Sequence, residues 1–252
     1  MPTQRFEFGG YDLSEWVEAW SASTPRRVEE SAVPRKDGVL VNDAKSGARR
    51  ITLRGTVSAE TPAALRSLWD QVLAGLHNTT GNETSAIAKL RVWDDRYVNA
   101  QLDAIREDYL TGLVGITFEA SYIAGEPYWI ADAVSSSLVT PATSSYTFSV
   151  VVGGSRPTAP LGIIITAGNA LPPGMSVTNL TTGETWVYDH ILDSSAALTV
   201  NHQDITVTKA GVNALDGFAG AFFALRPGPN TLQLAAETTA HTVQVVWQDR
   251  WN

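Results

Sequence analysis

Cysteine is absent from the 252-residue sequence. Its absence excludes disulfide bridges, thiolate zinc sites, iron–sulfur clusters and cysteine nucleophiles. No stretch approaches the roughly 20 consecutive apolar residues of a membrane-spanning helix. Met1–Phe8 lacks the hydrophobic run of a secretory signal, so we expect no cleaved signal peptide. The net charge of −8 argues against a protein that binds nucleic acid through an overall excess of basic residues.

The short motifs of the common enzyme classes are also missing. The sequence contains no Gly-Lys pair of a phosphate-binding loop, no G-x-G-x-x-G, no G-x-S-x-G and no H-E-x-x-H. His190, with Asp189, Asp193 or Asp204, could form a metal site, but a solvated loop is the preferred interpretation. The pair Asp94–Asp95 could supply catalytic carboxylates, but Asp is a common turn residue between strands. We therefore predict a protein that is not an enzyme, with no catalytic residues, no metal ligands and no cofactor.

Charge divides the chain into two parts. Of residues 1–128, 32 are charged, whereas only 12 of residues 129–252 are charged. The composition changes around Gly125–Trp129, and the small residues Ala133–Ser137 follow. A change of this kind is typical of a domain boundary. We predict an N-terminal domain over residues 1–130 and a C-terminal domain over residues 131–252.

One amphipathic helix stands out in the N-terminal half. Thr61 is a suitable N-cap, and Pro62 suits the first helical position. Six apolar residues then recur at helical spacing and predict a stripe that packs on a sheet: Leu65, Leu68, Trp69, Val72, Leu73 and Leu76. Strands are predicted at Arg5–Phe8, Arg50–Val57, Leu90–Trp93, Tyr97–Ala100 and Leu113–Ile123. The N-terminal half is therefore expected to be an α+β domain.

A hairpin is predicted around Asp37-Gly38, because Asp-Gly between two extended runs favours a two-residue turn. Basic residues gather between Arg26 and Arg54, and acidic residues are interleaved with them. A hairpin of mixed charge suits the pairing of subunits better than the binding of DNA. The candidate residues of an oligomer interface are Arg35, Lys36, Asp37, Gly38, Leu40 and Lys45.

The C-terminal half consists of short predicted strands separated by turn residues, a pattern typical of an antiparallel β-sandwich. The predicted strands are Tyr146–Val152, Leu161–Thr166, Ser176–Asn179, Glu184–Tyr188, Ala197–Val200, Ile205–Lys209, Phe222–Leu225, Thr231–Leu234 and Thr242–Trp247. The fold class expected for the whole chain is mainly β, with an α+β first domain and a β-sandwich second domain.

Trp186 and Tyr188 share one face of a predicted strand. Core packing is the preferred interpretation, and an exposed platform for sugar rings or a protein interface is the alternative. Together with His190 and His202, they form the candidate ligand or partner surface of this domain. Two functions remain open from these residues: a structural subunit of an assembly, or a carbohydrate-binding module.

The order of several motifs resembles the distal tail proteins of long-tailed siphophages. The chain begins with Phe-x-Phe-Gly-Gly-x-Asp-Leu at Phe6–Leu13, and the Asp-Gly hairpin, the strand Arg50–Val57 and the Leu-rich helix follow. A Leu-x-Val-Trp hairpin and a long strand then end at Glu126–Trp129. The pattern Leu-x-Pro-Gly-x-Asn precedes a strand at Leu225–Asn230. The resemblance spans nearly all of the chain.

This resemblance implies a homohexameric ring at the tip of the tail tube, through which DNA passes. The first domain would build the ring, and the second, a sandwich like that of galectins or carbohydrate-binding modules, would decorate it. The implied partners are other copies of the chain, the tail tube protein and a tail-associated, baseplate or fibre protein. The implied location is the tail tip of a virion assembled in the cytoplasm of a host bacterium. Neither a membrane nor a specific nucleic-acid sequence is an expected partner.

The sequence departs from sugar-binding galectins at the residues that hold the sugar. Galectins use His-x-Asn-x-Arg on one strand and Trp-x-x-Glu-x-Arg on another. Here His202 lies in Asn201–Asp204 with no Arg nearby, and Trp186 is followed by Val187–Asp189. We therefore expect that the domain has the sandwich without this sugar site, and host adhesion through carbohydrate binding is the second hypothesis.

Overall fold

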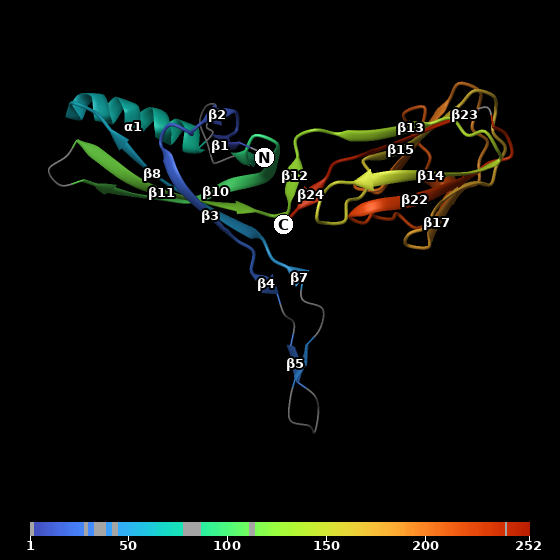
Figure 1. Ribbon diagram of the computed structural model, residues 1–252, viewed down its shortest axis with the longest axis horizontal. Coiled ribbons are helices and arrows are strands. Elements are labelled where there is room, and N and C mark those ends of the chain that lie inside the picture. The colour runs from blue at the N-terminus through green and yellow to red at the C-terminus, as the bar shows by residue number, and fades with distance from the viewer. Residues whose placement is uncertain are drawn as a thin grey trace. The chain divides into compact units, whose positions relative to one another are not determined.

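A computed structural model describes residues 3–27, 30–32, 39–41, 45–77, 87–110, 114–239 and 241–252. The chain divides into two compact units, Met1–Trp129 and Ile130–Asn252. Both consist mainly of antiparallel strands, and the described residues include one α-helix (Figure 1). This helix is not long and apolar enough to cross a membrane, nor is any other helix in the described ranges. The predicted fold class, mainly β, is confirmed.

The N-terminal unit is built on one antiparallel sheet in the order β2-β1-β9-β10-β11-β8-β3. Its strands are β1 (Gln4–Phe8), β2 (Tyr11–Asp12), β3 (Val17–Ser23), β8 (Arg49–Ser58), β9 (Ala88–Trp93), β10 (Arg96–Tyr109) and β11 (Gly115–Ala124). Gly9 and Gly10 join β1 to β2 with φ angles of 57° and 92°. Two positive φ angles are the geometry of a tight type I′ hairpin turn. The boundary between the two units falls within β12 (Trp129–Ala131).

The helix α1 (Pro62–His77) lies on one face of this sheet. Its N-terminus is capped as predicted, because the Thr61 hydroxyl accepts a hydrogen bond from the Ala64 N–H at 3.2 Å. The Trp69 ring packs against the Phe118 ring of β11, with the ring centres 5.7 Å apart. The Tyr122 hydroxyl donates to the carbonyl of Leu76 at 3.2 Å. The apolar stripe thus packs on a sheet, as its spacing predicts.

Burial alternates strictly along β8, the strand at the centre of this packing. Arg49, Ile51, Leu53, Gly55 and Val57 are buried, and the residues between them are exposed or half-buried. At Gly55, a Cβ atom would lie 1.9 Å from the carbonyl oxygen of Trp16. The start of β3 can therefore approach β8 only where β8 has no side chain.

The segment between β3 and β8 contains two short ladders that are separate from the main sheet. One pairs β4 (Arg26–Arg27) with β7 (Lys45–Ser46), and the other pairs β5 (Glu30–Ala32) with β6 (Val39–Val41). Ala32 pairs with Val39, and the predicted two-residue turn at Asp37-Gly38 lies outside the described residues.

The C-terminal unit contains two antiparallel sheets, in the orders β13-β23-β15-β18-β19-β20 and β14-β22-β16-β17-β21. The strands are β13 (Ser135–Val139), β14 (Ser145–Val152), β15 (Gly162–Ala167), β16 (Met175–Asn179), β17 (Glu184–Tyr188), β18 (Ala197–Asn201), β19 (Thr206–Lys209), β20 (Val212–Asn213), β21 (Phe218–Gly220), β22 (Gly228–Ala235) and β23 (His241–Trp247). A short 3-10 helix, η1 (Leu215–Gly217), precedes β21, and β24 (Arg250–Trp251) follows β23. Both sheets contribute to one buried apolar cluster, for example Val177 and Trp186 from one and Ile163 and Val243 from the other. The unit is a β-sandwich, as predicted.

The predicted strand Phe222–Leu225 is wrong in position, because the strand in this region is β21. Gly220 ends β21 with a φ angle of 121°, a backbone conformation that residues other than glycine rarely adopt. Beyond it, the Phe223 N–H donates to the His202 ring rather than to a neighbouring strand. β13 was not predicted, because its serine-rich sequence lacks the apolar pattern of a strand.

Replacing Trp69 by alanine is expected to destabilise the N-terminal unit by about 3–5 kcal/mol, because a buried aromatic ring is lost and a cavity remains. Trp69 is 5% exposed. Chemical denaturation of the full chain, followed by tryptophan fluorescence and circular dichroism, measures the change. Gln71→Ala, at an exposed position of the same helix, is the control and should change stability by less than about 0.5 kcal/mol. Equal stability of Trp69→Ala and wild type would contradict the burial of the stripe.

Candidate assembly surfaces

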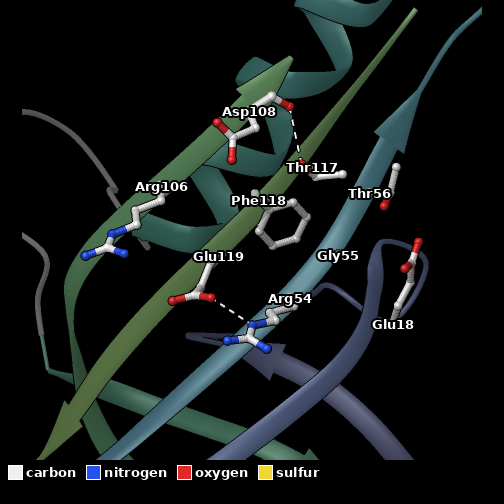
Figure 2. A pocket seen from close by; sticks show the side chains of 9 residues that line it. All are labelled: Glu18, Arg54, Gly55, Thr56, Arg106, Asp108, Thr117, Phe118 and Glu119. Carbon is white, nitrogen blue, oxygen red and sulfur yellow. Dashed lines mark hydrogen bonds and ion pairs between the residues drawn. The ribbon is translucent and has the colours of Figure 1, made fainter. Parts of the chain in front are cut away.

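The face of the N-terminal sheet opposite α1 carries charged and hydroxyl side chains. They follow from the same alternation that buries the apolar residues, because neighbouring residues of a strand point to opposite faces. The strand register aligns them in rows across β8, β11 and β10. One row is Arg54–Glu119–Arg106, and the next is Thr56–Thr117–Asp108. Figure 2 shows both rows on the three strands.

Ion pairs neutralise part of this face. Arg54 Nε lies 2.8 Å from Glu119 Oε2, and Arg50 Nη1 lies 3.0 Å from Asp103 Oδ2. Asp103 is the extra residue at an irregularity in the pairing of β10 with β11, between Leu102 and Ala104. A bulge of this kind redirects a side chain. Exposed ion pairs contribute at most about 1 kcal/mol each to the stability of the fold. These residues therefore matter mainly for the charge of this face.

A polar hollow of about 380 Å³ opens on this face (Figure 2). Its lining residues are Glu18, Arg54, Gly55, Thr56, Arg106, Asp108, Thr117, Phe118 and Glu119. Three carboxylates and two guanidinium groups are present, so the charges nearly cancel. Within the described ranges, no group of three or more His, Asp or Glu side chains is arranged to hold a metal ion. The hollow thus offers a hydrated surface of mixed charge.

Three tryptophans from different strands meet at another part of the N-terminal unit. Trp20 of β3, Trp93 of β9 and Trp129 of β12 pack edge to face, with ring centres 4.9–6.0 Å apart. The Arg49 guanidinium lies 5.3 Å from the centre of the Trp129 ring. The three tryptophans are far apart in the chain and share no local motif, so the sequence alone does not indicate this cluster.

The predicted interface residues fall mostly in the part of the chain that the structure does not describe. Arg35, Lys36, Asp37 and Gly38 lie outside the described residues. Leu40 is in β6 and pairs with Ser31, and Lys45 is in β7 and pairs with Arg27. Their role in an oligomer interface remains a prediction.

The four candidate residues of the C-terminal unit do not form one surface. Trp186 and Tyr188 are 0% and 1% exposed and belong to the core. Both point inward because β17 alternates, and Val187 between them is half-buried. Burial removes the two rings from the candidate surface, since no sugar ring could stack on them. His190 is exposed beside the Tyr188 ring, at 5.8 Å between ring centres.

His202 is buried, and its environment favours the neutral ring. Its Nδ1 atom accepts a hydrogen bond from the Phe223 N–H at 2.9 Å, and its ring centre lies 4.4 Å from that of Phe223. Its Nε2 atom is buried without a hydrogen-bond partner. Burial lowers the pKa of His202 to about 4, because a charged ring would lose its hydration. The residue therefore supports the core rather than a ligand site.

The C-terminal unit should lose stability as the pH falls from about 6.5 to about 4. In this window the unfolded chain binds a proton at His202 and the folded chain does not, so the contribution is complete above the unfolded pKa and is lost below it. The expected loss is about 3 kcal/mol for the shift to a pKa of about 4.

Thermal unfolding of the full chain across this pH range tests the expectation. His202→Asn, whose side-chain oxygen can replace the Nδ1 acceptor, should show a flatter pH dependence than wild type. His190→Asn, at an exposed position, should retain the dependence of wild type. Identical pH profiles for His202→Asn and wild type would contradict a buried neutral His202.

One family model and several solved structures of phage tail proteins are similar to this chain. Residues 153–251 match the family model described as the C-terminal domain of the siphovirus-type tail component. The crystal structure of the Dit protein (gp 19.1) of phage SPP1, described as a paradigm of the hub adsorption apparatus in phages that infect Gram-positive bacteria, has the same fold. It is 15% identical, and the alignment covers 99% of this chain and 100% of that protein, with a TM-score of 0.73.

A chain of the activated phage P2 baseplate also matches, at 8% identity over 94% of this chain and 92% of that chain, with a TM-score of 0.40. None of the curated protein sequences matches this chain. The predicted resemblance to the distal tail proteins of siphophages is confirmed to this extent: residues 153–251 match the C-terminal domain of the siphovirus-type tail component, and the whole chain has the fold of the SPP1 Dit protein.

Proposed function

We propose that six copies of this chain form a ring that joins the tail tube to the tail-tip or baseplate proteins, and that DNA passes through the ring. The N-terminal unit builds the ring, and the C-terminal unit is a spacer or docking surface. The role is structural rather than catalytic, at the tail tip of a virion assembled in the cytoplasm of the host bacterium. The observation that carries the proposal is the fold, which matches the SPP1 hub protein over 99% of this chain.

The open face of the N-terminal sheet supports a channel through which DNA moves freely. A protein that holds DNA neutralises phosphates with unpaired Lys and Arg side chains. Here Arg50 and Arg54 are ion-paired with carboxylates, and Glu18 and Asp108 add negative charge near Arg106. If this face lines the channel, phosphates meet a surface of balanced charge and hydroxyl groups.

The edge of the same sheet supports an interface between copies. In the described part of the chain, β3 pairs with β8 on one side and with no strand on the other. Such an edge carries free N–H and C=O groups that can pair with another chain. A closed ring requires two different surfaces of each copy to meet. The edge of β3 and the adjoining segment 24–48, which we term the arm, are suited to be one of these surfaces.

The C-terminal unit offers little support for carbohydrate binding. The two aromatic rings that could have stacked on a sugar are in the core, and His202 is buried among aromatic side chains. Docking of a tail-associated, baseplate or fibre protein is the role that fits the proposed ring.

Shortening the arm should abolish the ring and leave the protomer folded. Arg27 and Lys45 are directly paired in the β4–β7 ladder, so an Asn-Gly turn can replace residues 28–44. Mass photometry and negative-stain microscopy at low micromolar concentration measure the ring, and circular dichroism measures folding. The expected result is a folded monomer where the wild type forms hexamers.

A second variant tests whether ring assembly depends on the sequence of the arm or only on its length. It keeps residues 28–44 at their natural number and replaces them with glycine and serine. We expect it to assemble as poorly as the shortened variant. Hexamers of the shortened variant at the wild-type concentration would overturn the role of the arm, whereas a wild type that never forms rings, with or without tail tube protein, would overturn the ring itself.

A further inference from the structure

Arg49 occupies a core position. It is the first residue of β8, pairs with Ala124 of β11, and shares the buried face of the strand with Ile51 and Leu53. Its side chain and backbone together are 6% exposed. An arginine is among the residues least often found at such a position unless its charge is paired.

Among the described residues, the contacts of Arg49 include no counter-ion. Nε donates a hydrogen bond to the Thr24 hydroxyl at 3.1 Å, and the guanidinium lies over the Trp129 ring. Nη1 is buried and has no hydrogen-bond partner in the described structure. No carboxylate forms an ion pair with Arg49 among the described residues, whereas Arg91, which is also largely buried, is paired with Glu7 at 3.3 Å.

This arrangement is unfavourable for an isolated protomer. Burial lowers the pKa of Arg49, which reflects the lost hydration of the charged group. A cation over an aromatic ring recovers part of that loss. A buried N–H without an acceptor adds a further penalty, and apolar residues of similar volume often replace buried charges without loss of stability. The stability of its own unit therefore does not explain an arginine at this position.

The position of Arg49 in the fold indicates what could complete it. Thr24 and Arg49 stand at the two ends of the arm, where the chain leaves β3 and returns to β8. Beside them lie Trp20 and Trp93, which are half-buried and whose rings pack on Trp129. The guanidinium thus lies beside the start and end of the arm, the segment proposed to form part of the interface between copies.

We propose that Arg49 is an intersubunit residue, whose Nη1 donates to a carboxylate of a second copy of this chain. The inference rests on the proposed ring and adds a specific contact to it. Among the described residues of one protomer, Nη1 has no acceptor, and in this proposal the neighbour supplies it. A carboxylate is the acceptor that matches the planar fork of a guanidinium. The guanidinium is buried beside the Trp129 ring, where little water competes for its N–H groups, which strengthens the interaction. Side-chain shifts near Thr24 would admit the carboxylate on assembly.

Two substitutions of Arg49 test this contact in the full chain. Arg49→Met keeps the volume and removes the charge, and Arg49→Lys keeps the charge and removes the fork. Arg50→Met is the control, because Arg50 is the next residue of β8 and its ion pair with Asp103 is exposed. Mass photometry over a concentration series measures ring formation, and thermal unfolding below the assembly concentration measures the protomer.

Arg49→Met is expected to unfold at the same or a higher temperature than wild type and to need at least tenfold more protein for half-assembly. Arg49→Lys should lie between Arg49→Met and wild type in assembly, and Arg50→Met should assemble as wild type does. Assembly of Arg49→Met at the wild-type concentration would overturn the inference and leave the ring intact. A lower unfolding temperature for both Arg49 variants as protomers would also overturn it, because Arg49 would then stabilise its own unit. Absence of rings in the wild type would instead overturn the proposed function on which the inference rests.

Discussion

The helix α1 packs on one face of the N-terminal sheet, and the arrangement of the described strands in this unit depends on that packing. α1 packs on β8 and β11 through Trp69 and the residues around it. The strands must therefore alternate between buried apolar residues and polar residues on the open face. The rows of Arg, Glu, Asp and Thr across β8, β11 and β10 are the direct consequence. The same packing that stabilises the unit also produces the surface proposed to line a channel.

The proposed assembly is supported by unpaired groups of the described residues rather than by a pocket. The edge of β3 has one paired side in the described residues, and Arg49 has a buried N–H without an acceptor. Unpaired backbone groups and unpaired charges are costly when water is excluded. Both lie next to the arm, so one neighbouring copy could complete both. This coincidence is the physical link between the fold of the protomer and the proposed ring.

The C-terminal unit is more self-contained. Its two sheets share one apolar core that includes Trp186, Tyr188 and the rings around His202. A core of this kind provides a rigid body, and its function depends on the residues that remain outside. The burial of the two aromatic rings favours docking or spacing over the stacking of sugars, while the match of residues 153–251 to the tail component family agrees with a tail role.

The sequence by itself determined the elements whose signals are local. The cap at Thr61, the helical stripe around Trp69 and the alternation along Arg50–Val57 are properties of neighbouring residues, so the helix and the central strand could be predicted from them. The order of motifs along the chain also indicated the tail-protein resemblance. Phe222–Leu225 was predicted as a strand because its residues are apolar, but the backbone of Phe223 bonds to His202, which is 21 positions earlier in the chain.

Only the tertiary structure decided which residues meet. The register of β8, β11 and β10 aligns Arg54, Glu119 and Arg106 in one row, and the sheet order brings Trp20, Trp93 and Trp129 together. Whether Trp186 faces solvent or core, and whether Arg49 finds a counter-ion, also depends on residues distant in the chain. Local patterns determine which residues form strands and helices, whereas burial and charge pairing depend on neighbours in space, and these neighbours exist only once the sheets have formed.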